Sequence, residues 1–188
     1  MSPSDKQALV SLLAKRSARR GSFTLSSGKQ SSLYIDARLT TMSPEGLSLI
    51  GPLGLDAIRN AQWAADSVGG LTLGADPIAY AISYASAHEA SPIRAFTVRK
   101  EAKAHGTGKL IEGPFSAGDD VVIVEDVITT GSSAARAVQA VRAAGGSVLG
   151  VLALVDRDEG GRESLEGLGL SVVSLVSAAD ILAEATEG

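Results

Sequence analysis

Runs of consecutive aliphatic residues alternate along the chain with segments in which apolar residues recur every three or four positions. The aliphatic runs predict strands at 68–73, 93–98, 121–126, 148–156 and 170–176. Helices are predicted from Asp76-Pro77, over 133–144 up to Gly145-Gly146, and after Ser177, which pairs with Asp180 as a cap. Strands that are aliphatic throughout are typical of a parallel sheet covered on both faces. We therefore expect an α/β fold with a central, mainly parallel sheet flanked by helices.

The N-terminal part of the chain follows a different pattern. Ser4, with Gln7 three residues later, predicts the cap of a helix with an apolar face. FTLSSGKQSSLYID, residues 23–36, alternates polar and apolar residues around a glycine, which predicts a hairpin of short strands. Ser43 and Pro44 suit the cap and the first position of a second helix. A polar loop is expected from residue 99 to about 118.

Composition narrows the class of protein. With 188 residues, 45% hydrophobic and 20% charged, the chain suits one folded domain. A net charge of −4 gives no indication of a nucleic-acid partner. The chain has no cysteine and two histidines, which argues against disulfides and zinc sites. The N-terminus lacks the apolar core of a signal peptide, and the longest apolar run, 148–155, is too short to span a membrane, so we expect a cytoplasmic protein without membrane contact.

VVIVEDVITTGSS, residues 121–133, carries the clearest candidate chemistry. Glu125 and Asp126 are expected where a parallel strand ends, and ligands of open α/β sheets bind at that edge. Residues 129–133 are four hydroxyl residues around Gly131 before a helix, an arrangement that favours binding of a phosphate. Solvated acids and a simple helix cap are the alternatives. There is no Walker A lysine and no GxGxxG, and acids beside a phosphate loop suit a sugar phosphate.

RKEAKAHGTGK, residues 99–109, concentrates positive charge in an acidic chain. Its two glycines favour mobility, and a solvated surface loop is the alternative interpretation. Beside a phosphate site, its cations could neutralise the charge that develops on a departing diphosphate.

These segments resemble one family. The stretch 121–133 resembles the phosphoribosyl-diphosphate (PRPP) signature of type I phosphoribosyltransferases, which PRPP synthetases and regulators share. RKEAKAHG is similar to the RKExKxHG loop of the orotate phosphoribosyltransferases, the pyrimidine branch. The stretch 23–36 resembles that family's FxLxSGxxSxxYxD, and VDRDEGG, residues 155–161, its DRxExG segment. The resemblance runs from about residue 20 to residue 180 and implies the type I phosphoribosyltransferase fold, with residues about 1–40 and the C-terminal segment forming a small hood.

The resemblance also implies an activity: transfer of phosphoribosyl from PRPP to N1 of orotate, giving orotidine 5′-monophosphate and diphosphate in UMP biosynthesis. It implies catalytic roles for Lys103, His105 and Asp126. The implied PRPP-binding residues are Arg99, Lys100, Lys103, His105, Glu125, Asp126, Val127, Ile128, Thr129, Thr130, Gly131, Ser132 and Ser133. The implied orotate-binding residues are Thr129, Arg157, Lys29 and Tyr34.

The family further implies Mg²⁺ held mainly by substrate oxygens, and a homodimer in which the basic loop closes over the neighbouring subunit's site. Two departures stand out, because Gly74 and Ser26 occupy positions where some members carry lysine. A purine or uracil phosphoribosyltransferase is the alternative within the superfamily, but those enzymes lack the RKEAKAHG loop. A non-catalytic PRPP-binding regulator is the alternative outside the enzymes, and it usually brings an added domain or a basic face.

Overall fold

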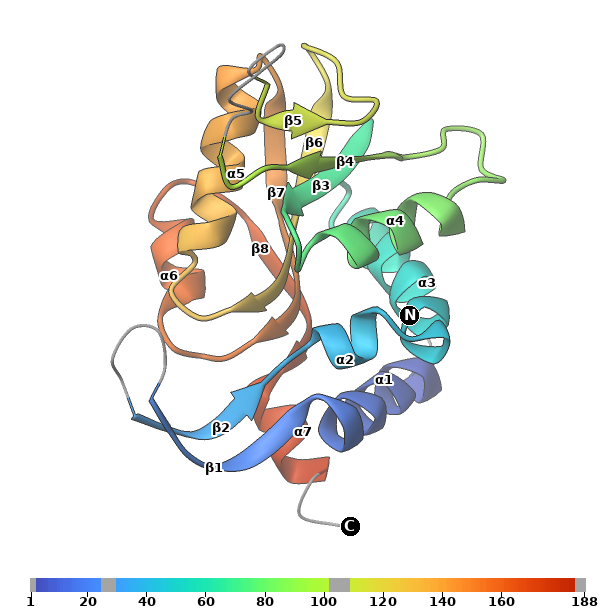
Figure 1. Ribbon diagram of the computed structural model, residues 1–188. Coiled ribbons are helices and arrows are strands. Elements are labelled where there is room, and N and C mark those ends of the chain that lie inside the picture. The colour runs from blue at the N-terminus through green and yellow to red at the C-terminus, as the bar shows by residue number, and fades with distance from the viewer. Residues whose placement is uncertain (1–2, 25–29, 102–108, 185–188) are drawn as a thin grey trace.

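A six-stranded sheet forms the centre of the computed structural model, which describes residues 3–24, 30–101 and 109–184 (Figure 1). The strand order is β5-β4-β3-β6-β7-β8, and every neighbouring pair is parallel except β4 and β5. The strands are β3 (Ser67–Leu71), β4 (Arg94–Val98), β5 (Ile111–Glu112), β6 (Asp120–Ile128), β7 (Ser147–Asp156) and β8 (Val172–Ser177). The predicted α/β class with a mainly parallel sheet is confirmed.

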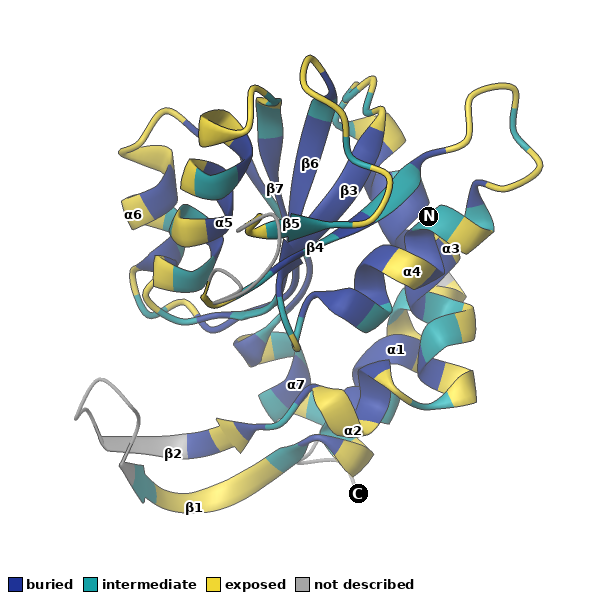
Figure 2. Cartoon of the chain, turned by 45° about the horizontal axis from the view of Figure 1, so that its top comes forward, coloured by how far each residue is buried: buried dark blue, intermediate teal, exposed yellow. Residues whose placement is uncertain are grey.

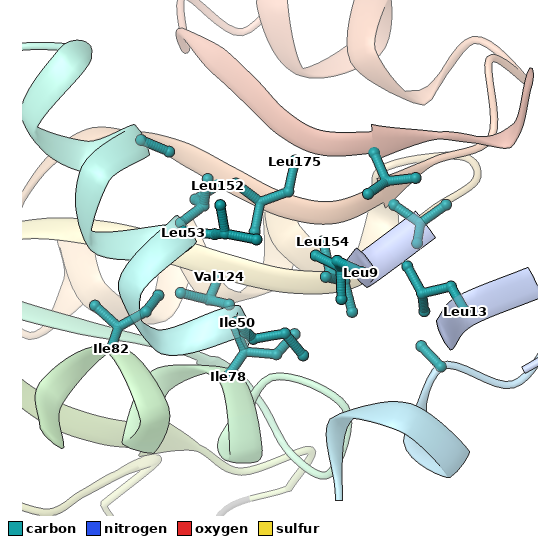
Figure 3. Packing of buried hydrophobic residues seen from close by; sticks show 14 of the residues in the cluster. Leu9, Leu13, Ile50, Leu53, Ile78, Ile82, Val124, Leu152, Leu154 and Leu175 are labelled. Atoms are coloured by element: carbon teal, nitrogen blue, oxygen red, sulfur yellow. The ribbon is translucent and has the colours of Figure 1, made fainter. Parts of the chain in front are cut away.

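Helices cover both faces of this sheet. The helices α3 (Pro44–Asn60) and α4 (Asp76–Ala85) lie on one face, and α5 (Ser132–Ala143) and α6 (Gly161–Glu166) lie on the other. The helix α1 (Pro3–Arg16) packs against α3. Successive residues of β6 explain the division: Val122 and Val124 belong to the core under the first group, whereas Val121 and Ile123 belong to the core under the second. Figure 3 shows the first core, and in Figure 2 the central strands are buried almost throughout.

The N-terminal segment builds a separate unit beside the sheet. β1 (Ala18–Thr24) and β2 (Gln30–Ile35) pair antiparallel in a two-stranded sheet, and the short helix α2 (Arg38–Thr41) follows. The C-terminal helix α7 (Ala178–Glu184) packs against α1, where Gln7 Nε2 donates to a carboxylate oxygen of Glu184 at 2.7 Å. In Figure 1 the hairpin, α1, α2 and α7 lie together below the sheet.

Several local predictions are confirmed. The hydroxyl of Ser43 accepts a hydrogen bond from the Gly46 amide at 3.1 Å, so it caps α3 as predicted. Ser177 and Asp180 cap each other at the start of α7, at 3.0 and 3.1 Å. Among the described residues, no helix is long and apolar enough to cross a membrane.

Other local predictions are wrong in detail. α1 already includes Pro3, so Ser4 lies inside the helix rather than at its cap. The expected polar loop contains β5, because residues 111–112 pair with the end of β4. β6 does not end at the carboxylates but runs on to Ile128, because residues 127–128 pair with β7. Glu125 and Asp126 therefore belong to a strand, which fixes their direction more firmly than a loop would.

Candidate active site

The candidate site lies where the order of the strands in the central sheet reverses. β3 is joined through α4 to β4 on one side, whereas β6, which comes later, pairs with β3 on the other side. In open α/β sheets ligands bind at this switch point, at the carboxyl ends of the strands. A pocket of about 290 Å³ lies there. Its lining comprises Tyr34, Ile35, Asp36, Ala37, Arg38, Leu71, Thr72, Leu73, Gly74, Lys100, Glu125, Asp126, Val127 and Ser133.

Two adjacent carboxyl groups lie in this pocket. Glu125 is 9% exposed, and its Oε2 atom is buried without a hydrogen-bond partner among the described residues. Burial, and then the neighbouring charge of Asp126, raise the pKa of Glu125 to about 9. Burial also raises the pKa of Asp126, while hydrogen bonds, first from the Val127 amide, hold it down. Near neutral pH the pair therefore holds a proton on Glu125 and can both donate to and accept from hydroxyl groups.

The hydroxyl loop forms a small hollow that adjoins the pocket. Residues 127–133 line this hollow together with Glu125. Gly131 has a φ of 77° and immediately precedes α5, so the loop turns through a conformation that glycine adopts without strain. The first amide groups of a helix have no partner within it, and the helix dipole favours an anion there. The structure thus brings the predicted phosphate loop against the predicted carboxyl pair.

Within residues 127–133, not every side chain can contact a ligand. Ile128 is 1% exposed and belongs to the core under α5, so only its backbone could face a ligand. Val127 lines both the pocket and the hollow. Thr129, Thr130, Ser132 and Ser133 all line the hollow, and Ser133 reaches the pocket as well.

The basic segment reaches the pocket from the end of β4. Lys100 lines the pocket and a second, open hollow of about 480 Å³ beside it. Arg99 lines only the second hollow, where its Nη1 atom lies 3.5 Å from a carboxylate oxygen of Glu112. Arg136 of α5 donates from Nη2 to the Lys100 carbonyl oxygen at 2.8 Å and so holds that backbone in place. Lys103 and His105, predicted from the same segment, lie outside the described residues.

The residues predicted to bind orotate are only partly brought together. Tyr34 is 41% exposed and lines the pocket, with its ring 5.5 Å from that of Phe23. Arg157 is buried and does not line the pocket. Its Nη2 atom donates to the Leu33 carbonyl oxygen and pairs with Glu159, each at 2.8 Å. Arg157 thus supports β2, the strand that carries Tyr34. Lys29, which was also predicted to bind orotate, lies outside the described residues.

From the facing wall of the pocket, sequence reasoning singled out only Gly74, and it missed Arg38 in the lining of the pocket. Arg38 lines it and forms two hydrogen bonds to Asp36, at 2.8 and 3.0 Å. Its positive charge also favours the ionised form of Asp126 and opposes the rise in that pKa. Residues 72–74 form the facing wall, and Gly74 lies against the Asp126 carboxylate. An acid two residues before a base at the end of a strand could have indicated Arg38, whereas Gly74 was noted from the sequence only as a departure from lysine.

The described residues contain no group of three or more histidine, cysteine, aspartate or glutamate side chains placed to hold a metal ion. The arrangement offers a carboxyl pair that can bind hydroxyl groups, an adjoining hollow before α5 that can bind a phosphate, and two cations, Arg38 and Lys100, in the lining of the pocket. These features suit a ligand that has a sugar in the middle and phosphates at two ends.

Comparison with known proteins identifies the family of the chain. No family model matches the chain. The orotate phosphoribosyltransferase of Aquifex aeolicus (strain VF5) is 46% identical over 181 residues, which cover 95% of this chain and 98% of that protein. A crystal structure of the Mycobacterium tuberculosis H37Rv orotate phosphoribosyltransferase in complex with Fe(III) dicitrate is 45% identical, with a TM-score of 0.83 over 94% of this chain and 98% of that one.

A further crystal structure of the M. tuberculosis enzyme, in complex with PRPP, has a TM-score of 0.79 and 42% identity, and covers 94% of this chain and 98% of that one. Identity at this level over nearly the full length of both chains is decisive for the family. The chain belongs to the orotate phosphoribosyltransferases, the pentosyltransferases of pyrimidine biosynthesis.

Proposed function

We propose that Glu125 and Asp126 bind the ribose hydroxyls of PRPP and that residues 129–133 bind its 5′-phosphate. The observation that carries this assignment is the adjacency of the buried carboxyl pair to the hydroxyl hollow, with Glu125 and Val127 lining both. The unpartnered Oε2 atom of Glu125 supports it, because a buried polar atom without a partner is costly unless a ligand supplies one. In this arrangement C1 of the ribose faces the open part of the pocket.

The diphosphate of PRPP then lies toward residues 72–74 and the basic segment. Lys100 reaches the pocket, and Arg99 lines the hollow next to it. Lys103 and His105 complete the cationic set and neutralise charge as the diphosphate leaves. Of these two, Lys103 has the main role and His105 assists.

Orotate lies between the ribose and the N-terminal hairpin. Tyr34 supplies a face of the pocket for the base. Thr129, which lines the adjoining hollow, and Lys29 are assigned to the base as well. Arg157 pairs with the orotate carboxylate, for which a planar guanidinium is well suited. Because Arg157 contacts the Leu33 carbonyl and Glu159 in the described state, orotate must either share the guanidinium with these groups or displace Glu159.

The reaction replaces the C1–O bond to diphosphate by a C1–N1 bond to orotate. The electron pair of the broken C1–O bond leaves with the diphosphate, and N1 of orotate releases its proton, to the departing diphosphate or to water, as the C1–N1 bond forms. Charge develops on the sugar and on the leaving group. The protein contributes position and electrostatics: the carboxyl pair fixes the ribose, and the cations stabilise the diphosphate. Asp126 lies close to the ribose in this arrangement, so its charge also favours the sugar cation.

Mg²⁺ fits this pocket as an ion carried by the substrate. Glu125 and Asp126 are two neighbouring carboxyl groups, and Asp36 in the same lining is held by Arg38. No three such side chains among the described residues are placed to hold a metal ion. Mg²⁺ commonly keeps several waters and binds through few carboxylates together with substrate phosphates. Bound Mg²⁺ would neutralise charge on the diphosphate oxygens, with Glu125 and Asp126 as its protein neighbours.

The proposed active form is a cytoplasmic homodimer in which the basic loop of each subunit closes over the site of the other. A surface on α3 and α4 supports self-association: it has an apolar hollow of about 580 Å³, and Tyr84 at its rim is 84% exposed. A projecting ring and a hollow on the same face suit an isologous two-fold contact. Residues about 1–40 and the C-terminal segment form the proposed hood over the orotate end of the site.

An acceptor assay tests the function. The protein is incubated with PRPP and Mg²⁺, and orotate, uracil, hypoxanthine and adenine are offered separately. Consumption of orotate alone is expected. Consumption of a purine or of uracil in preference to orotate would contradict the proposed acceptor, and absence of any turnover, with PRPP still bound, would favour a non-catalytic regulator.

A further inference from the structure

A buried carboxylate outside the pocket joins the two segments that form the diphosphate side of the site. Asp76, in the first turn of α4, is 8% exposed. Its Oδ2 atom accepts a hydrogen bond from the Thr72 hydroxyl at 2.6 Å, and its Oδ1 atom accepts one from the Thr97 hydroxyl at 2.9 Å. Because the Thr97 hydroxyl donates to Asp76, the Tyr80 hydroxyl, 3.0 Å away, donates to Thr97.

Both segments that Asp76 joins line the site. Thr72 begins the wall formed by residues 72–74, which faces Asp126, and it lines both the pocket and the second hollow. Thr97 lies in β4, three residues before Lys100, which also lines both spaces. A backbone bond from the Thr72 amide to the Val98 carbonyl oxygen at 2.8 Å links the same two segments.

Asp76 therefore holds the wall formed by residues 72–74 at a fixed distance from the end of β4, which leads to Lys100. Burying a carboxylate is costly, and a well-packed apolar side chain often holds two segments together equally well. A carboxylate with one hydroxyl on each oxygen instead allows a single relative placement of Thr72 and Thr97. The position of Asp76 at the start of a helix offsets part of the cost, since the helix dipole favours negative charge there.

We propose that Asp76 is a positioning residue for PRPP: it sets the wall at residues 72–74 and the end of β4 at the separation that the diphosphate requires. The inference rests on the proposed placement of PRPP in this pocket. Asp76 does not line the pocket, so its effect passes through Thr72 and Thr97. Loss of the bridge is expected to weaken PRPP binding while leaving the orotate end of the site intact.

Steady-state kinetics of Asp76→Ala, Asp76→Asn and Thr97→Val test the proposal, with KM measured for each substrate separately. Asp76→Ala is expected to raise KM for PRPP about tenfold, the scale of a lost hydrogen bond to a charged group, with KM for orotate within about twofold of wild type. Asp76→Asn keeps an acceptor and a donor and should recover most of the loss. Thr97→Val keeps the shape of the side chain and should raise KM for PRPP in the same direction, by about threefold.

Asp119→Ala is the matched control. Asp119 is also buried and also accepts from a hydroxyl, that of Ser67 at 3.1 Å, but it lies next to the start of β6, at the opposite end of the sheet. Its removal should reduce thermal stability without changing KM for PRPP. Equal effects of Asp119→Ala and Asp76→Ala on both KM values would overturn the proposal, because a purely structural role would then suffice.

One further variant distinguishes a failure of the positioning role of Asp76 from a failure of the proposed PRPP site. Asp126→Asn in the same assay must raise KM for PRPP if PRPP lies where proposed, whatever Asp76 does. If Asp126→Asn has its effect and both Asp76→Ala and Thr97→Val leave KM for PRPP unchanged, the positioning role is wrong. Thr97→Val decides the matter if Asp76→Ala does not fold.

Discussion

Gly74 lies directly against the carboxylate of Asp126, so that a methyl group at position 74 would overlap both carboxylate oxygens. At this position the wall approaches the carboxyl pair with its backbone alone. The close approach explains why glycine occupies this position.

Gly74→Ala should weaken PRPP binding, because the new methyl group must displace either the wall or Asp126. A loss of about tenfold or more in affinity is expected from the misplaced contacts. Isothermal titration calorimetry with Mg²⁺ and PRPP measures it, and Gly167→Ala is the control, since a methyl group there meets its nearest neighbour at 3.3 Å. Unchanged affinity in Gly74→Ala would show that the wall does not need to approach Asp126.

Glu125→Gln should raise the free energy of unfolding at neutral pH. Burial raises the pKa of Glu125 to about 9 from an ordinary 4.5, so the native protein keeps a proton that the unfolded chain releases between those values. The unfolded state binds fewer protons in this window, and stability therefore falls as pH rises through it. Glutamine does not ionise, so the gain should be small near pH 5 and on the order of 3 kcal/mol near pH 7.

Urea unfolding at several pH values measures this difference. Glu45→Gln is the control, because a hydrogen bond from Arg16 lowers the pKa of Glu45 to about 2, and its effect is confined to acid conditions. The wild-type slope between about pH 5 and pH 9 should persist in Glu45→Gln and flatten in Glu125→Gln. The same slope in all three proteins would mean that Glu125 is ionised at neutral pH.

The strands, and the stretch that lines the pocket and the adjoining hollow, were predictable because their signals are local. The aliphatic runs marked β3, β4, β6, β7 and β8, and one contiguous stretch carries both the carboxyl pair and the hydroxyl loop. The end of β6 was not predictable in the same way, since residues 127–128 extend the strand only because β7 pairs with them.

The rest of the pocket is formed by segments that are distant in the sequence and that the order of the strands brings together. Arg38 follows the hairpin, Gly74 follows β3, and both reach Asp126 on β6, so no sequence spacing relates them. The same holds for Asp76, whose partners lie 4 and 21 residues away. Arg157 was a candidate from the sequence, but its burial and its contact with the Leu33 carbonyl oxygen of β2 could not be predicted from local sequence.

Arg157→Ala should raise KM for orotate by about tenfold or more and change KM for PRPP by less than about twofold, since a paired guanidinium is lost at one end of the site. Separate KM measurements for the two substrates test this. Arg162→Ala is the control, because Arg162 lies in the same segment but pairs with Asp156, at 2.8 Å. Parallel changes in both KM values in Arg157→Ala would assign the residue to support of β2 instead of to orotate.

Mixing Lys103→Ala and Asp126→Ala subunits should restore activity that neither variant has alone. In a heterodimer with shared sites, one site combines the intact Asp126 of one subunit with the intact Lys103 of its partner, so about half of the wild-type activity per dimer is expected. Differently tagged subunits, refolded together and purified as heterodimers, allow the measurement. Activity no greater than in either homodimer would show that each basic loop serves its own subunit.

PRPP affinity of Asp126→Asn tests the central claim most directly. The substitution keeps the size of the side chain and removes its charge, and calorimetric titration with Mg²⁺ and PRPP reports binding without turnover. A loss of at least about tenfold relative to wild type is predicted, against little change in Asp158→Asn, an aspartate outside the lining of the pocket. Equal PRPP affinity in wild type and Asp126→Asn would contradict the assignment of the carboxyl pair to the ribose.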